Sequence, residues 1–214
     1  MSKNAAVSIA AVVGAFLLII GVALLVVRPW ESAGASADDV ELIDESTHVL
    51  DDAGADAPQL VEFFDYECPT CGQFHPVIED LRERYEGQVT FAVRYFPLSG
   101  HENAVPAAAA AEAAAQQGEF EAMHDRILET QAEWAGTEDA AATFRSYAEE
   151  LGLDLAAYDA ALTAEATADR IAHDFDAGVE AGVTQTPTFF LDGERLELQD
   201  FGDVEAAIVD ALQQ

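Results

Sequence analysis

Cys68 and Cys71 form a Cys-x-x-Cys pair, the part of this chain whose residue types and spacing could do chemistry. They are its only cysteines, and a bridge between them closes too small a loop to add much stability, so reactivity explains them better. Apolar patterning predicts a strand over residues 60–66 and a helix over 72–85. Unpaired N–H groups at the start of that helix stabilise a thiolate on Cys68, and Cys71 lies one turn further on, placed to attack a mixed disulfide. The spacing therefore indicates a dithiol–disulfide exchange site.

Metal binding is the alternative use of these thiols. His75 extends the pair to Cys-x-x-Cys-x-x-x-His, a pattern open to a copper or zinc carrier. Structural zinc requires three or four clustered ligands, and the sequence has no second cysteine pair. Covalent haem requires a histidine directly after the second cysteine, where Gly72 stands. We therefore assign no metal ligand. The remaining histidines, which show no ligand spacing, are His48, His101, His124 and His173.

The segments around the pair predict an α/β domain. A second strand is expected over residues 89–96, and a strand, a helix and a strand in so short a stretch predict a βαβ unit with parallel strands. Residues 48–50 are a candidate edge strand. A hairpin with strands at 188–191 and 195–198, then a last helix capped by Asp203, completes the domain.

A long helical stretch separates the two halves of this domain. Residues 97–182 have helical character, with one helix starting near Asn103 and another opening at Thr137. A crossover between parallel strands needs only about a dozen residues. Because the stretch is much longer, we expect an inserted helical subdomain at about 99–182.

The N-terminal part predicts membrane attachment. An uncharged, mostly apolar run over residues 5–27, flanked by Lys3 and Arg28, is long enough to span a bilayer. It exceeds the usual apolar core of a secretory signal, although the Ala-Ser-Ala sequence at 35–37 leaves cleavage as an alternative. Three segments are therefore expected: a transmembrane anchor over 1–28 with its N-terminus inside, an acidic tether over 29–47 and an exported domain over 48–214.

The charge balance restricts the partners. The net charge of −32 comes from 41 acidic and 9 basic residues. Such a surface repels nucleic acid, which we exclude as a partner. An acidic, lysine-poor and alanine-rich chain fits adaptation to high salt, where screening relieves self-repulsion. Biased genomic composition is the alternative explanation.

Two motifs carry a family resemblance. The stretch EFFDYECPTC from Glu62 to Cys71 and the stretch GVTQTPTFF from Gly182 to Phe190 resemble the DsbA-like group of the thioredoxin superfamily. The helical insertion falls between them, as it does in that group, and the resemblance covers about 48–214. It implies an α/β thioredoxin fold with an inserted helical subdomain.

The resemblance also implies roles for individual residues. Cys68 matches the exposed nucleophile of the family, and Cys71 matches its buried resolving thiol. Glu62 matches a buried acid that accepts the proton of the resolving thiol, a role that burial favours by raising a carboxyl pKa. The cis-proline loop of the family offers backbone hydrogen bonds to an extended substrate. The residues implied to contact substrate are Thr186 and Pro187 of that loop, with Pro69 and Thr70 between the cysteines.

The residues next to Cys68 bear on its acidity. Strongly oxidising relatives often carry histidine at the position of Thr70, where a positive charge stabilises the thiolate. Thr70 offers only a hydroxyl. The nearby carboxylates of Asp65 and Glu67 are expected to raise the pKa of the Cys68 thiol through like-charge repulsion.

These features predict an extracytoplasmic thiol–disulfide oxidoreductase, single-pass in the cell membrane, that introduces disulfides into exported cysteine-containing polypeptides. The redox-active pair Cys68–Cys71 would act without a bound cofactor, and a membrane redox partner would reoxidise it. A reductase of the same fold, for example in cytochrome maturation, is the main alternative. A copper or zinc carrier and a non-catalytic peptide-binding module are others.

Overall fold

The computed structural model describes residues 40–214. The expected anchor over residues 1–28, and the expected tether up to residue 39, lie outside the described residues. None of the helices within 40–214 combines the length and the apolar character that crossing a bilayer requires.

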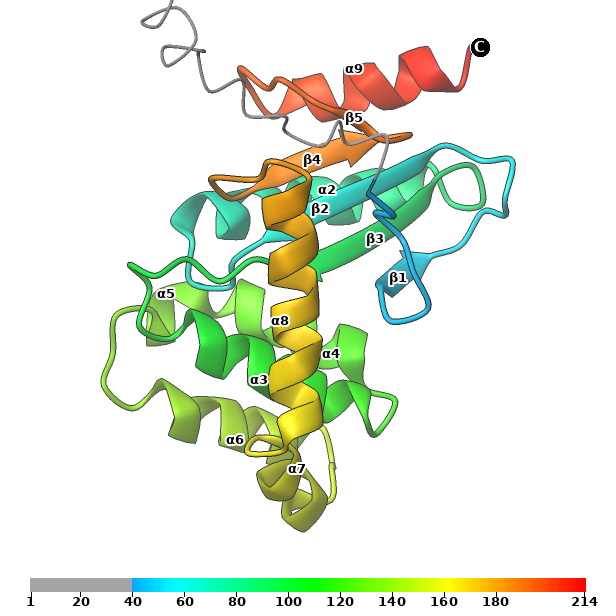
Figure 1. The fold of residues 1–214 in the computed structure, drawn as a ribbon. Coiled ribbons are helices and arrows are strands. Elements are labelled where there is room, and N and C mark those ends of the chain that lie inside the picture. Colours follow the sequence, from blue (N-terminus) through cyan, green and yellow to red (C-terminus); the bar gives the residue numbers. More distant parts are fainter. Residues whose placement is uncertain (1–39) are drawn as a thin grey trace, which may run out of the picture. The chain divides into compact units, whose positions relative to one another are not determined.

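A five-stranded sheet forms the centre of the described domain (Figure 1). Its strands follow the order β1-β3-β2-β4-β5, with β2 and β3 parallel and the other neighbours antiparallel. The structure therefore confirms the predicted βαβ unit and the edge strand near residue 48. The strands are β1 His48–Asp51, β2 Gln59–Phe64, β3 Thr90–Tyr95, β4 Thr188–Leu191 and β5 Glu194–Arg195.

Helices cover both faces of the sheet. On one face, α2 (Pro69–Arg84) and α9 (Gly202–Ala211) pack on the strands through an apolar cluster that includes Leu60 of β2. Because side chains alternate along a strand, Val61 points to the other face, towards α8 (Glu165–Glu180). Burial on both faces explains why β2 and β3 are apolar along most of their length.

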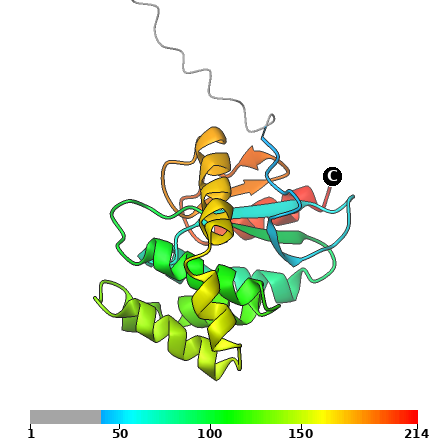
Figure 2. The same cartoon turned by 60° about the horizontal axis from the view of Figure 1, so that its bottom comes forward.

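The helices between β3 and β4 gather beside the sheet (Figures 1 and 2). The alanine-rich helix α3 (Ala104–Ala115) contacts α4, α6, α7 and α8, because its small buried side chains allow close approach. The structure thus places a helical layer where the sequence predicted an insertion. The other helices of this group are α4 Phe120–Glu129, α5 Gln131–Trp134, α6 Ala140–Glu150 and α7 Leu155–Ala161.

Two helix starts differ from the prediction. Helix α6 begins at Ala140 and not at Thr137, whose hydroxyl instead donates to the carbonyl of Trp134 and closes the preceding loop. Asp203 does not cap α9, because it already lies in the first turn of that helix. Its carboxylate accepts hydrogen bonds from the backbone N–H groups of Gln199 and Asp200 and so holds the loop before the helix.

Two short elements also differ. Strand β5 contains only Glu194 and Arg195, so the second arm of the hairpin is shorter than the predicted 195–198. The four-residue helix α5 was not predicted. Its Trp134 is fully buried and donates its indole N–H to the carbonyl of Ile127, a tertiary contact that apolar periodicity does not reveal.

The last part of the expected tether packs on the domain. Leu42 is buried against the sheet in the cluster that contains Val61. The carboxylate of Asp44 lies 3.1 Å from the guanidinium of Arg94 and 2.7 Å from the ring of His173. Arg94 also donates to the carbonyls of residues 41 and 42. Residues 40–47 therefore do not form a free tether.

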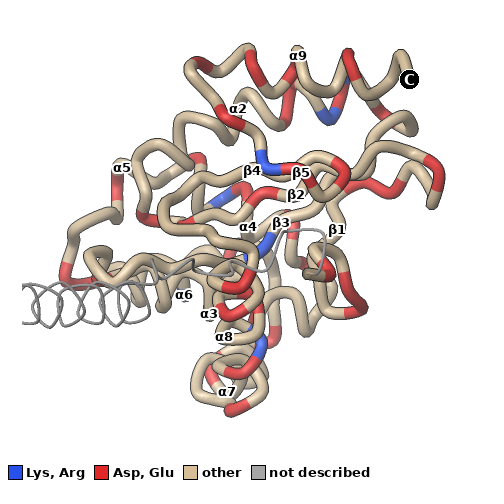
Figure 3. Tube along the Cα trace, turned by 45° about the horizontal axis from the view of Figure 1, so that its top comes forward, with Lys and Arg blue, Asp and Glu red and all other residues tan. Residues whose placement is uncertain are grey.

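Acidic residues occur along most elements of the described chain, whereas basic residues are few (Figure 3). Two buried arginines each meet several carboxylates. Arg82 of α2 donates to Asp51, Glu79 and Glu121. Arg94 of β3 lies between Asp44 and Asp174 and is almost completely buried. These two arginines thus form ion pairs inside the fold and are not available on its surface.

Candidate active site

Cys68 lies at the N-terminus of α2, as predicted. It is the N-cap residue, followed by Pro69 in the first turn, where proline fits because its missing N–H would be unpaired anyway. The Gly72 N–H donates to the Cys68 carbonyl at 3.2 Å and forms the first turn of the helix. The helix therefore begins three residues earlier than residue 72, the predicted start. Its free N–H groups surround the Cys68 thiol.

The two thiols have opposite acidities. Both cysteines are buried, and their thiols are not joined in a disulfide in this structure. The pKa of Cys68 is lowered to about 5 by a hydrogen bond from the Cys71 thiol, helped by Thr186 and by the N–H groups of Cys71 and Thr70, against the effect of burial. The pKa of Cys71 is raised well above 9.0 by burial, by the same hydrogen bond and by the charge of Glu62. At neutral pH the site therefore holds a Cys68 thiolate beside a protonated Cys71.

The prediction that neighbouring carboxylates raise the pKa of Cys68 is wrong. The Asp65 carboxylate accepts hydrogen bonds from the Leu98 N–H at 2.8 Å and from the His101 ring at 2.7 Å. The Glu67 carboxylate accepts one from the Asn103 N–H at 2.6 Å and another from the Gly136 N–H at 2.7 Å. These donors stabilise both negative charges, and the donors around Cys68 lower its pKa.

His101 lies at this end of the domain, hydrogen-bonded to Asp65. Burial lowers its pKa, but the hydrogen bond to Asp65 and the charges of Asp65, Cys68 and Glu67 outweigh that effect and raise it. Sequence reasoning missed this residue, because it lies in the loop after β3 and its spacing from the cysteines carries no motif. A raised pKa favours the protonated ring, which carries the kind of charge that a histidine at the position of Thr70 would supply.

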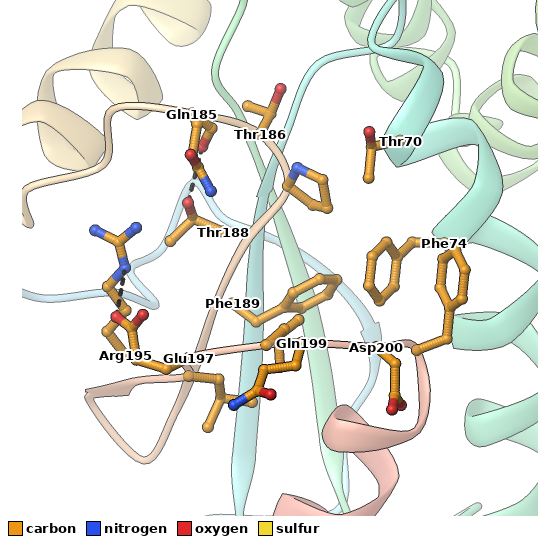
Figure 4. A pocket seen from close by; sticks show the side chains of 14 residues that line it. Thr70, Phe74, Gln185, Thr186, Thr188, Phe189, Arg195, Glu197, Gln199 and Asp200 are labelled. Atoms are coloured by element: carbon orange, nitrogen blue, oxygen red, sulfur yellow. Dashed lines mark hydrogen bonds and ion pairs between the residues drawn. The ribbon is translucent and has the colours of Figure 1, made fainter.

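The loop before β4 packs against the nucleophile. The Thr186–Pro187 peptide bond is cis, as the resemblance implied. The Cys68 thiol, when protonated, donates to the Thr186 carbonyl at 3.3 Å. Beside this loop lies a groove of about 460 Å³, whose lining includes Thr70, Pro187 and Phe74 (Figure 4). Pro69 is exposed and does not line it.

Glu62 lies on β2, on the face of the sheet that carries α2. Burial raises the pKa of its carboxyl to about 8, with smaller contributions from the charges of Cys68 and Glu79. Together with Cys71 and His75 it lines a cavity of about 10 Å³, room for about one water molecule. A neutral carboxyl that close to the resolving thiol can exchange a proton with it.

Gln131 of α5 is a further residue that sequence reasoning missed. Its side-chain amide donates to the carbonyl of Tyr66 at 2.7 Å and to the carbonyl of Cys68 at 2.8 Å. The helical layer thus holds the backbone of the active-site turn directly. No local pattern connects residues this far apart in the chain.

The metal alternative built on Cys68, Cys71 and His75 is not assembled. Among the described residues, the potential metal ligands that gather as a group of three are His75, His124 and Asp125. His75 therefore gathers with ligands of α4, and no group of three within residues 40–214 includes a cysteine.

Comparison with known proteins identifies the fold as that of thioredoxin. The family model described as Thioredoxin matches residues 53–210. A thioredoxin-like oxidoreductase from Silicibacter pomeroyi is 27% identical, with a TM-score of 0.67 over 81% of this chain and 96% of that chain. Two further structures support the fold alone. α-DsbA1 of Wolbachia pipientis is 18% identical, with a TM-score of 0.71 over 84% of this chain and 96% of that chain. BdbD of Bacillus subtilis is 21% identical, with a TM-score of 0.70 over 79% of this chain and 94% of that chain.

The curated relatives are much longer proteins. A protein of Salinispora tropica named Na(+)/H(+) antiporter NhaA 3 is 43% identical over 137 residues, which cover 64% of this chain and 20% of that protein. The NhaA antiporter of Herminiimonas arsenicoxydans is 34% identical over 153 residues, 72% of this chain and 23% of that protein. This chain thus spans about a fifth of the length of the curated relatives it matches.

Proposed function

This chain belongs to the thioredoxin family, and from that premise we propose that it is a dithiol oxidase that introduces disulfides into exported polypeptides. The family and the paired thiols support thiol–disulfide oxidoreductase activity in general. The direction of electron flow, the exported location and the substrates are the parts that we add.

The lowered pKa of Cys68, about 5, carries this proposal. A thiol of low pKa is a good leaving group, and a stabilised thiolate favours the reduced form of the pair. A protein whose reduced form is stabilised accepts electrons readily and is therefore an oxidant. Positive charge on His101 favours the same direction.

The proposed reaction moves two electrons from substrate to enzyme. A substrate thiolate attacks Sγ of Cys68 in the oxidised pair, the Cys68–Cys71 bond breaks, and a mixed disulfide forms. The departing Cys71 sulfur takes a proton from Glu62, which is neutral below about pH 8. A second substrate thiolate then attacks the substrate sulfur of the mixed disulfide, and Cys68 leaves as a thiolate. The substrate gains one disulfide and the enzyme becomes a dithiol.

The groove beside Thr186 and Pro187 is the proposed binding place for substrate. An extended polypeptide there can pair with the backbone of the loop in the manner of an added strand, with its cysteine directed at Cys68. Thr70 and Phe74 line the side of the groove that α2 forms (Figure 4). Such backbone pairing accepts many sequences, which suits a general disulfide donor.

Reoxidation requires an electron acceptor, for which we propose a membrane redox partner. Attachment through the apolar run at residues 5–27 would keep the domain near that partner, outside the cytoplasm. We propose no bound cofactor, because the cysteine pair itself carries both electrons. Sodium–proton exchange, the activity in the names of the curated relatives, is not proposed here, because this chain matches only about a fifth of their length.

The reduction potential of the Cys68–Cys71 pair tests the proposal, measured by equilibration with glutathione buffers. We expect a value near the oxidising end of the scale, about −120 mV. A value near about −270 mV would identify a reductase and overturn the proposed direction. A matched pair of variants locates the nucleophile: Cys71→Ser should trap a mixed disulfide with a model substrate peptide, whereas Cys68→Ser should trap none.

A further inference from the structure

Three potential metal ligands meet where α2 packs on α4. They are His75 of α2 with His124 and Asp125 of α4, and one donor atom from each lies within 4.8 Å of the others. The two imidazole rings are 5.6 Å apart between centroids and nearly perpendicular. Both histidines are more than nine-tenths buried.

These groups do not satisfy one another. The closest approach of His75 to Asp125, between Nε2 and Oδ1, is 3.9 Å, too long for a hydrogen bond. That Asp125 oxygen is buried and has no hydrogen-bond partner among the described residues. Buried polar atoms in folded proteins are nearly always bonded, so a cluster left this way indicates a missing partner that carries positive charge or donates protons.

A neighbouring residue orients one of the rings. The Tyr66 hydroxyl lies 3.0 Å from Nδ1 of His124, which leaves Nε2 as the ring nitrogen available to an ion. A hydrogen bond to the second nitrogen of a ligating histidine is a regular feature of metal sites.

We propose that His75, His124 and Asp125 bind one divalent transition-metal ion, for which zinc is the best fit. Two imidazole nitrogens and one carboxylate oxygen are donors that zinc accepts, with water in the fourth position of a tetrahedron. Magnesium and calcium prefer sites made of oxygen ligands and fit this set poorly. The site uses neither cysteine and is independent of the proposed oxidase activity.

An acidic groove lies beside one of the three residues. His75 lines a groove of about 550 Å³ together with Glu79, Glu83 and Glu129. Carboxylates along an approach raise the local concentration of cations and speed their arrival.

Zinc binding by the oxidised full-length chain tests the proposal, since the disulfide prevents the cysteines from acting as ligands. Competition of Zn²⁺ with a chromophoric chelator should show one tight site per chain. Co²⁺ in the same protein should give the visible spectrum of a four- or five-coordinate ion without a thiolate charge-transfer band. If the oxidised protein binds neither ion stoichiometrically, the proposal fails.

Variants identify the ligands. His75→Gln and Asp125→Asn should each weaken zinc binding at least 100-fold, and Tyr66→Phe by 10–100-fold. Asp169→Asn removes an exposed carboxylate from α8 as the matched control and should leave affinity unchanged. Equal affinities in all four variants would assign the binding to the acidic surface and overturn the site.

Discussion

Cys68 and Cys71 have identical side chains, so the difference between their thiol pKa values comes from their surroundings alone. Cys68 receives hydrogen bonds from the N-terminal turn of α2 and from Cys71, whereas Cys71 lies deeper and faces Glu62. One thiol is therefore ready to leave or attack, and the other holds a proton. The division of roles depends on the hydrogen that the two sulfurs share.

Glu62 permits a test at the same scale through the stability of the protein. The native protein keeps the Glu62 proton up to about pH 8, whereas the unfolded chain releases it near pH 4.5. Between these values the native state binds more protons, so the free energy of unfolding falls as pH rises. Glutamine has no such proton. The stability of Glu62→Gln relative to wild type should therefore rise by up to about 4 kcal/mol from pH 4.5 to pH 8.

Denaturant unfolding of the oxidised proteins across that pH range measures this difference, because oxidation removes the titration of Cys68. Glu83→Gln, which changes an exposed glutamate on α2, is the control and should show no such trend. A Glu62→Gln curve parallel to wild type would mean that the carboxyl titrates normally.

Sequence reasoning about these residues succeeded where the cause was local. The helix N-terminus at Cys68 follows from the adjacent strand and helix patterns. The acidity of Cys68 did not follow, because the partners of Asp65 and Glu67 include His101 and Asn103, which come from distant parts of the chain. The acidic residues near Cys68 in the sequence therefore suggested a raised pKa for its thiol, whereas the pKa is lowered.

At the scale of elements, the short helix α5 acts as a clamp on the active-site turn. The Gln131 amide holds two carbonyls of that turn and lies close against Gly72. A Cβ added at Gly72 would lie 2.5 Å from Oε1 of Gln131. The absence of a side chain at Gly72 is what lets the clamp close.

Gly72→Ala should therefore destabilise the protein by about 1–3 kcal/mol, through loss of two hydrogen bonds as Gln131 moves away. In a Gln131→Ala background the same substitution should stabilise it by about 0.5–1 kcal/mol, since alanine is the better helix former. A double-mutant cycle by denaturant unfolding measures both values. An equal effect of Gly72→Ala in the two backgrounds would show that the clamp is not the constraint.

The elements themselves were predicted where apolar periodicity was strong. Strands β2 and β3 and helix α2 follow it within a few residues. Helix α5 escaped prediction because buried tertiary hydrogen bonds hold it, including the one from Trp134. Periodicity reports which face is buried and carries no information on such bonds.

At the scale of the whole molecule, acidic charge dominates and the few arginines are concentrated at key contacts. Arg82 and Arg94 each gather carboxylates from several segments. Because acidic residues far outnumber basic ones, most of the remaining carboxylates have no positively charged partner. Folding must therefore work against a large self-repulsion in dilute buffer.

The midpoint of thermal unfolding should accordingly rise with NaCl concentration. If the composition reflects salt adaptation, the rise should continue above about 1 M, where the Debye length is about 3 Å. If it reflects genomic bias, the rise should end once screening reaches the spacing of neighbouring charges, near about 0.1–0.2 M. Circular dichroism between about 0.05 and 2 M distinguishes these outcomes, and a midpoint independent of salt would contradict both.

The Arg94 contacts determine where an autonomous folding unit can begin. The guanidinium donates hydrogen bonds to Asp44, to the carbonyls of residues 41 and 42, and to Asp174. A fragment that starts at the first strand, residue 48, would bury this cation with only part of its partners. We therefore expect the smallest independently stable piece of this protein to start at or before residue 41, ahead of the first element of regular structure.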